Sequence, residues 1–106
     1  MVQEDARKIL KQAGVKERMV ALDLSTLEDG FYQLIKEFIS NLQGEDKQQM
    51  ESIFNSIIMS RKSKITRLAE SVNEEPEIRK KLTAEEKEYF DSIVSATKQF
   101  KEKVMT

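Results

Sequence analysis

Four basic residues fall within one short stretch that no acidic residue interrupts: Arg61, Lys62, Lys64 and Arg67. On a helix, Arg61, Lys64 and Arg67 would line one strip, with Lys62 about 100° away. Such a strip could bind the phosphate backbone of a nucleic acid. No aromatic residue is interleaved with the charges, which favours a structural role. Arg61 would then donate two hydrogen bonds to a carboxylate in a helix interface, or the strip would be a solvated face.

Four acidic residues form a second cluster: Glu85, Glu86, Glu88 and Asp91. Two carboxylates held close together can perform acid–base chemistry or bind a metal ion. These four lie in the first two turns of a predicted helix, where negative charge interacts favourably with the helix dipole. We expect that local role rather than catalysis or metal binding.

Aromatic residues occur as two adjacent pairs, Phe31 with Tyr32 and Tyr89 with Phe90, and as the single residue Phe100. Their helical spacing is typical of core positions. The alternative is a subunit interface, in which aromatic side chains are enriched.

Most other catalytic chemistry lacks the residues that it needs. The sequence has no Cys and no His, which removes the commonest zinc ligands, thiol nucleophiles and imidazole bases. Neither a glycine-rich phosphate loop nor a nucleophile elbow is present. We therefore expect no enzyme activity, no cofactor and no metal.

Charge and hydropathy exclude two further classes of protein. Lys and Arg total 18 while Asp and Glu total 19, so the net charge of −1 excludes a globally basic nucleic-acid binder. The longest apolar run covers only residues 19–22, which is far too short to span a membrane. The first residues do not resemble a signal peptide. We expect a cytoplasmic protein with no membrane partner.

The elements that carry these residues are predicted to be helices. Three Gly and one Pro leave few tight turns, and 35% of the residues are charged. The length of 106 residues suits one domain, so we expect residues 1–106 to form a single all-α domain. The fold class is a four- to five-helix, bundle-like domain with a long central helix.

In the first half, apolar spacing predicts a short helix over residues 2–13 that ends before Gly14. Residues 15–24 fit no clear period and are predicted to be a connector. Ser25 and Glu28 form a capping-box pattern, which predicts that the next helix begins there and continues to Leu42.

A long helix is predicted over residues 45–72, too long for a domain of this size to bury fully. Its apolar stripe is interrupted at residues 61–64. Pro76 predicts a break, followed by a loop through Lys81. Thr83 and Glu86 repeat the capping-box pattern and predict a final helix to residue 104.

The order of these motifs resembles the helical domain of GINS subunits, most closely the archaeal type in which that domain comes first. The resemblance covers residues 22–104 and rests on three motifs in order: Leu24-x-x-Leu27-Glu28-Asp29-Gly30-Phe31-Tyr32, then Arg61-x-x-Lys64-Ile65 with Leu68-Ala69, then Leu82-Thr83-x-Glu85-Glu86. Each motif alone is weak, so the specificity lies in their order and spacing. Family members of this type also carry a small β-rich domain, which we expect to be absent here.

The resemblance implies a non-enzymatic DNA replication factor. Such a subunit would assemble into a homo- or hetero-tetramer with other GINS subunits and scaffold the MCM helicase with its partner proteins. Arg61 and Lys64 would be the basic pair of the central helix, and Phe31 and Tyr32 the aromatic start of the second. DNA contact would be indirect or weak, and the protein would be associated with the chromosome, in the nucleus if eukaryotic.

Two alternatives from other functional classes remain open. The first is a helical DNA-binding protein that uses Arg61, Lys62, Lys64 and Arg67, which predicts an affinity that falls steeply with salt. The second is a helical module of unrelated function, either an oligomerisation module or a stand-alone bundle.

Overall fold

The computed structural model describes residues 3–20, 23–71 and 76–106. Within these ranges all regular structure is helical, which confirms the predicted fold class. The molecule is elongated, with principal extents of 55 × 23 × 22 Å. The described residues form the helices α1 (Gln3–Met19), α2 (Phe31–Ser40), α3 (Gly44–Glu70), α4 (Pro76–Arg79) and α5 (Ala84–Met105).

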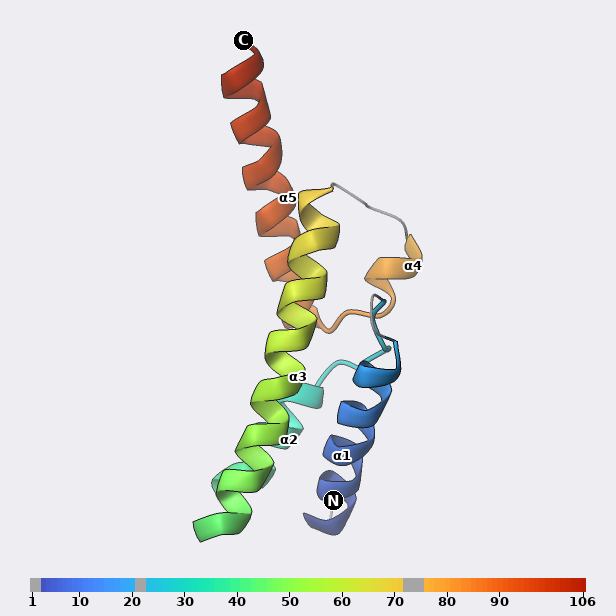
Figure 1. The fold of residues 1–106 in the computed structure, drawn as a ribbon, viewed down its shortest axis with the longest axis vertical. Coiled ribbons are helices and arrows are strands. Elements are labelled where there is room, and N and C mark those ends of the chain that lie inside the picture. The colour runs from blue at the N-terminus through green and yellow to red at the C-terminus, as the bar shows by residue number, and fades with distance from the viewer. Residues whose placement is uncertain (1–2, 21–22, 72–75) are drawn as a thin grey trace.

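Helix α3 is the long central helix, and the other helices pack along it. Figure 1 shows α1 and α2 beside the lower half of α3, and α5 beside its upper half. Helix α5 runs parallel to α3 and continues beyond the end of α3 (Figure 1). The structure thus has two packing regions on one shared helix.

Each region has its own hydrophobic core. The lower core joins α1, α2 and the first half of α3, and its most buried members include Leu10, Ile35, Met50 and Ile57. The upper core joins the second half of α3 to α4 and α5, and its members are Leu24, Ile65, Ala69, Ile78, Leu82, Phe90 and Val94. Between Ile58 and Ile65 the one large apolar side chain of α3 is Met59, which is 57% exposed and belongs to neither core.

The first helix is longer than predicted: α1 does not end before Gly14 but continues through it to Met19. A Cβ atom at Gly14 would lie 3.5 Å from Cγ2 of Ile53, so this glycine faces α3 within the helix interface. The buried stripe of α1 continues from Ala13 to Glu17. The predicted connector over residues 15–24 is therefore wrong for residues 15–19, and residues 21–22 lie outside the described ranges.

The second helix begins later than predicted, at Phe31 rather than at Ser25. Its N-cap is Gly30, whose φ of 89° is a left-handed conformation that glycine adopts at little cost. The Ser25 hydroxyl donates to the Glu17 carboxylate instead of capping a helix. The capping box predicted for Ser25 and Glu28 is therefore wrong, because a tertiary partner takes the hydroxyl.

The second half of the chain follows the prediction more closely. Helix α3 covers most of the predicted 45–72, although residues 72–75 lie outside the described ranges. The predicted loop through Lys81 contains the short helix α4, whose Ile78 packs into the upper core. The capping box of Thr83 and Glu86 is confirmed at the start of α5. No helix among the described residues is long and apolar enough to cross a membrane.

Candidate functional site

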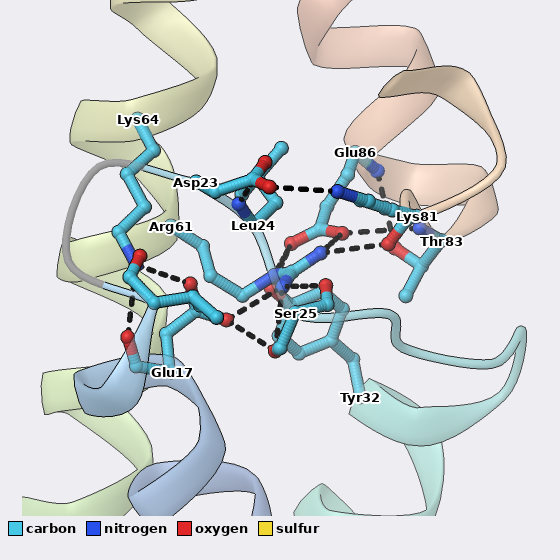
Figure 2. Close-up of polar contacts among 11 residues, drawn as sticks. Glu17, Asp23, Leu24, Ser25, Tyr32, Arg61, Lys64, Lys81, Thr83 and Glu86 are labelled. Carbon is cyan, nitrogen blue, oxygen red and sulfur yellow. Dashed lines mark hydrogen bonds and ion pairs between the residues drawn. The ribbon is translucent and has the colours of Figure 1, made fainter. Parts of the chain in front are cut away.

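Arg61 lies where the two cores meet, in the interruption of the apolar stripe on α3. Its exposed fraction is 0%, and that of Lys64, one turn later, is 5%. A buried charge is tolerated only when it is paired and hydrogen-bonded. The surrounding residues supply those partners from four other parts of the chain (Figure 2).

All five N–H groups of the Arg61 guanidinium have acceptors. Its Nε and Nη2 donate to the two carboxylate oxygens of Glu86 at 2.6 and 2.8 Å. Its Nη1 donates to Oε1 of Glu17 and to the backbone carbonyl of Ser25, both at 2.7 Å. Its Nη2 also donates to the carbonyl of Lys81 at 2.9 Å. The fork–fork geometry with Glu86 is the strong, bidentate form of this ion pair.

Glu86 joins this pairing to the start of α5. Oε1 of Glu86 accepts from the backbone N–H of Thr83 at 3.0 Å, and the Thr83 hydroxyl accepts from the backbone N–H of Glu86 at 3.2 Å. Oε2 of Glu86 accepts from the Tyr32 hydroxyl of α2 at 2.5 Å. One carboxylate therefore caps α5 and holds both α2 and α3.

Glu17 makes the corresponding link to α1. Its Oε1 accepts from Ser25 and Arg61, and its Oε2 accepts from Nζ of Lys64 at 2.5 Å. The Lys64 ammonium also donates to the backbone carbonyls of Glu17 and Val20. Here we call Glu17, Ser25, Tyr32, Arg61, Lys64 and Glu86 the junction network.

The pKa shifts of Glu17 and Arg61 favour the charged forms of these two side chains. Burial raises the pKa of Glu17, but hydrogen bonds from Lys64, Ser25 and Arg61 outweigh burial and leave that pKa below its ordinary value. Burial lowers the pKa of Arg61, but its hydrogen bonds to Glu86 and Glu17 outweigh burial and leave that pKa above its ordinary value. Burial and the bond to Glu86 both raise the pKa of Tyr32, so its hydroxyl keeps the donated proton.

This arrangement suits a structural role and not acid–base chemistry. Its two cations and two carboxylates balance in charge. No buried side-chain nitrogen or oxygen atom lacks a partner among the described residues. With its donors and acceptors engaged, the junction network fixes how α1, α2, α3 and α5 meet.

The other basic and acidic residues singled out in the sequence lie apart from one another. Lys62 and Arg67 are exposed on α3, whereas Arg61 and Lys64 are buried, so the four do not form one surface strip. Of the acidic cluster, Glu85 and Glu88 are exposed and Asp91 pairs with Arg79 at 2.7 Å. No group of acidic side chains in the described ranges could hold a metal ion.

The aromatic residues divide between the cores and the surface. Phe31 packs in the lower core and Phe90 in the upper core. Tyr89 is 37% exposed, and its hydroxyl lies 2.9 Å from that of Thr66. Phe100 is 68% exposed, near the end of α5.

The free end of α5, residues 97–105, carries three exposed large apolar side chains. Arg61 pairs with Glu86 and Thr66 with Tyr89, while α3 ends at Glu70. About ten residues of α5, or about 15 Å, therefore extend beyond α3. Val104 and Met105 are 67% and 84% exposed there, beside Phe100.

Sequence reasoning missed Glu17 and Ser25 as members of the junction network. Glu17 follows Leu10 by seven residues and Ala13 by four, which is the spacing of one helix face. A polar residue at that spacing, together with the interruption at Arg61, is the signal that could have found the pair.

Comparison with known proteins agrees with this architecture. The model of the GINS complex protein helical bundle domain matches residues 4–105, which is nearly the whole chain. No curated protein and no solved structure gives a significant match. The chain therefore belongs to the GINS family, whose members are non-catalytic DNA replication factors that form complexes with other GINS subunits.

Proposed function

We propose that this chain is a non-enzymatic subunit of a GINS tetramer that scaffolds the MCM replicative helicase with its partner proteins. The tetramer contains either four copies of this chain or this chain with another GINS subunit. Family membership supports the helicase link, and it favours action at the chromosome, in the cytoplasm or, in a eukaryote, in the nucleus. Residues 1–106 act in this proposal as one helical domain.

The exposed apolar face on the free end of α5 is the observation that carries the assembly part of this proposal. Phe100 and Val104 are four residues apart, so they lie on one side of the helix. They continue the side of α5 on which Ile93 packs against the upper core. Burial of each large apolar side chain would contribute about 1.5–3 kcal/mol.

A helix end of this kind is poorly supported in an isolated subunit. Helical segments of about ten residues are marginal in water unless an apolar face is packed. Contiguous exposed apolar surface often marks an interface. A neighbouring GINS subunit that packs against this face would both order the helix and remove the apolar side chains from water.

Binding experiments with substituted chains test the proposal. Phe100→Glu places a charge in the proposed interface and should abolish co-purification with the other subunits of the tetramer and with purified MCM helicase. Met59→Glu is the matched control, since Met59 is a large apolar residue with 57% exposure in the middle of α3. The assembly proposal fails if both variants co-purify like the unsubstituted chain. The helicase link fails if the assembled tetramer does not retain MCM.

A further inference from the structure

An open groove lies on α3, between α2 and the start of α5, and its lining includes Tyr32 and Glu86 of the junction network. Its volume is about 490 Å³. A second groove of about 380 Å³ continues along α2 and α3 and shares Lys36, Phe54 and Ile58 with the first. Together they form one trough, here called the α2–α3 groove.

The floor of the α2–α3 groove is apolar and aromatic. It is formed mainly by Tyr32, Phe54, Ile58, Ile65 and Tyr89. Ile58 is half-buried, yet it belongs to neither the lower nor the upper core. The exposed part of Ile58 therefore lines the groove.

The middle of the groove is positively charged. Lys36 on α2 and Lys62 on α3 line it, and both side chains are exposed. Neither forms an ion pair with a described carboxylate, although the chain carries slightly more acidic than basic residues. Toward one end lie Glu85 and the paired Glu86, and toward the other lie Glu51 and the half-buried Lys47. An occupant that crosses the middle would meet unpaired positive charge.

The dimensions suit a helix. From Phe54 to Ile65 the floor follows α3 for eleven residues, or about 16 Å, which matches about three turns of a second helix. Amphipathic helices bind such grooves through apolar residues spaced three or four apart. From the apolar floor and the unpaired lysines, we propose that the α2–α3 groove binds an acidic amphipathic helix of a partner protein. Acidic side chains of that helix would pair with Lys36 and Lys62 while its apolar face packs on Ile58.

This site is separate from the free end of α5, so the inference does not rest on the assembly proposal. Single-stranded nucleic acid fits the groove less well, because the floor includes Ile58 and Ile65 as well as aromatic rings and because glutamates lie at both ends. A second copy of this chain is the remaining occupant, and the experiment distinguishes it.

The probe is a fluorescein-labelled synthetic peptide of about four helical turns, with leucines on one face and glutamates on the other. A second peptide has lysine in place of every glutamate. Fluorescence anisotropy with the full chain measures binding of each. The acidic peptide should bind saturably, and the basic peptide should bind at least about tenfold more weakly.

Substitutions locate the binding. Lys36→Glu with Lys62→Glu should weaken binding of the acidic peptide at least about tenfold, and Ile58→Gln should weaken it at constant charge. The control pair is Lys8→Glu with Lys11→Glu, which makes the same change of charge on the exposed side of α1, outside the groove. That pair and Phe100→Glu should leave binding within about twofold, since both lie beyond direct charge contact with the groove.

Four results would overturn the inference. The first is the absence of saturable binding by the acidic peptide, and the second is an equal loss in the control pair. Displacement of the peptide by a single-stranded oligonucleotide would assign the groove to nucleic acid. Self-association of the chain that Lys36→Glu with Lys62→Glu abolishes would assign it to a second copy.

Discussion

At the junction network four charged side chains are buried, whereas at the free end of α5 large apolar side chains are exposed. The charged groups at the junction are fully hydrogen-bonded to one another and to the backbone. The apolar groups on α5 have no comparable packing within the described domain. Buried charge here fixes how the helices meet, whereas the free end of α5 leaves large apolar side chains exposed.

Buried charge on α3 also separates the lower core from the upper core. Arg61 and Lys64 take positions on α3 that an apolar stripe would otherwise fill. A buried ion pair is a weak source of net stability, but breaking one is costly. The junction network therefore constrains the relative placement of the two cores more than it adds to their stability.

Removal of Arg61 should have the largest effect. Arg61→Ala leaves the carboxylates of Glu17 and Glu86 buried without their main partner and should lower the free energy of unfolding by about 3–5 kcal/mol. Urea unfolding followed by circular dichroism measures this. The control is Lys62→Ala, an exposed neighbour, which should change stability by less than about 0.5 kcal/mol. Equal, small effects of both substitutions would remove the contrast between buried and exposed charge.

The second-largest effect should come from acid, which should weaken the junction network. The pKa of Glu17 is lower in the folded chain than in the unfolded chain, where it is about 4.3. Its stabilisation is therefore present above that value and is lost as pH falls through the folded pKa. Glu17→Gln should cost about 1–3 kcal/mol near neutral pH, and the difference from the unsubstituted chain should shrink below about pH 4. Unfolding midpoints of the two chains, measured from neutral pH to below about pH 4, check this expectation. A difference between the two midpoints that did not change with pH would contradict it.

Loss of the Tyr32 hydroxyl should have a smaller effect. Tyr32→Phe removes one hydrogen bond to the Glu86 carboxylate and should cost about 1–2 kcal/mol. The pKa of Tyr32 is raised by folding, so this contribution is present below about pH 10 and is lost as pH rises through the folded pKa. Thermal unfolding of both chains at neutral and alkaline pH checks the sign. A difference that grew above pH 10 would be inconsistent with a donated proton.

The smallest expected effect concerns DNA. Four phosphate contacts would give a slope of log affinity against log salt of about −3.6, whereas two give at most about −1.8. Because Arg61 and Lys64 are buried, we expect weak duplex binding with the smaller slope. Anisotropy of a labelled duplex at several salt concentrations measures this. A slope near −3.6 that Lys62→Ala with Arg67→Ala abolished would show that residues 61–67 bind phosphates.

Periodicity and capping patterns predict a helix where its signals are local, even where buried charges interrupt the apolar stripe, as Arg61 and Lys64 do on α3. The long helix α3 and the capped start of α5 were predicted because Thr83, Glu86 and the apolar stripes are local signals. The end of α1 was not, because Gly14 resembles a helix terminus and Glu17 resembles an exposed residue. The helical position of Gly14 and the burial of Glu17 both depend on the packing of α3 against α1, which no local pattern encodes.

The junction network could be predicted only in part. The interruption at residues 61–64 indicated that Arg61 would need a carboxylate if it were buried. The identity of the partners depends on contacts over 25 and 44 residues of sequence, to Glu86 and Glu17. The pattern of Ser25 and Glu28 predicts a helix cap, because a capping-box pattern does not distinguish a local partner of the hydroxyl from a tertiary one.

The most direct test of the proposed assembly is the solution mass of the chain, alone and mixed with other GINS subunits, by light scattering across concentrations at fixed salt. We expect a stable multimer near four subunits for the unsubstituted chain in at least one of these samples. Phe100→Glu with Val104→Glu should yield a monomer that remains folded by circular dichroism, although it lacks the stabilisation that assembly gives the unsubstituted chain. A monomer in every sample of the unsubstituted chain, or a multimer that survives both substitutions, would contradict assembly through the free end of α5.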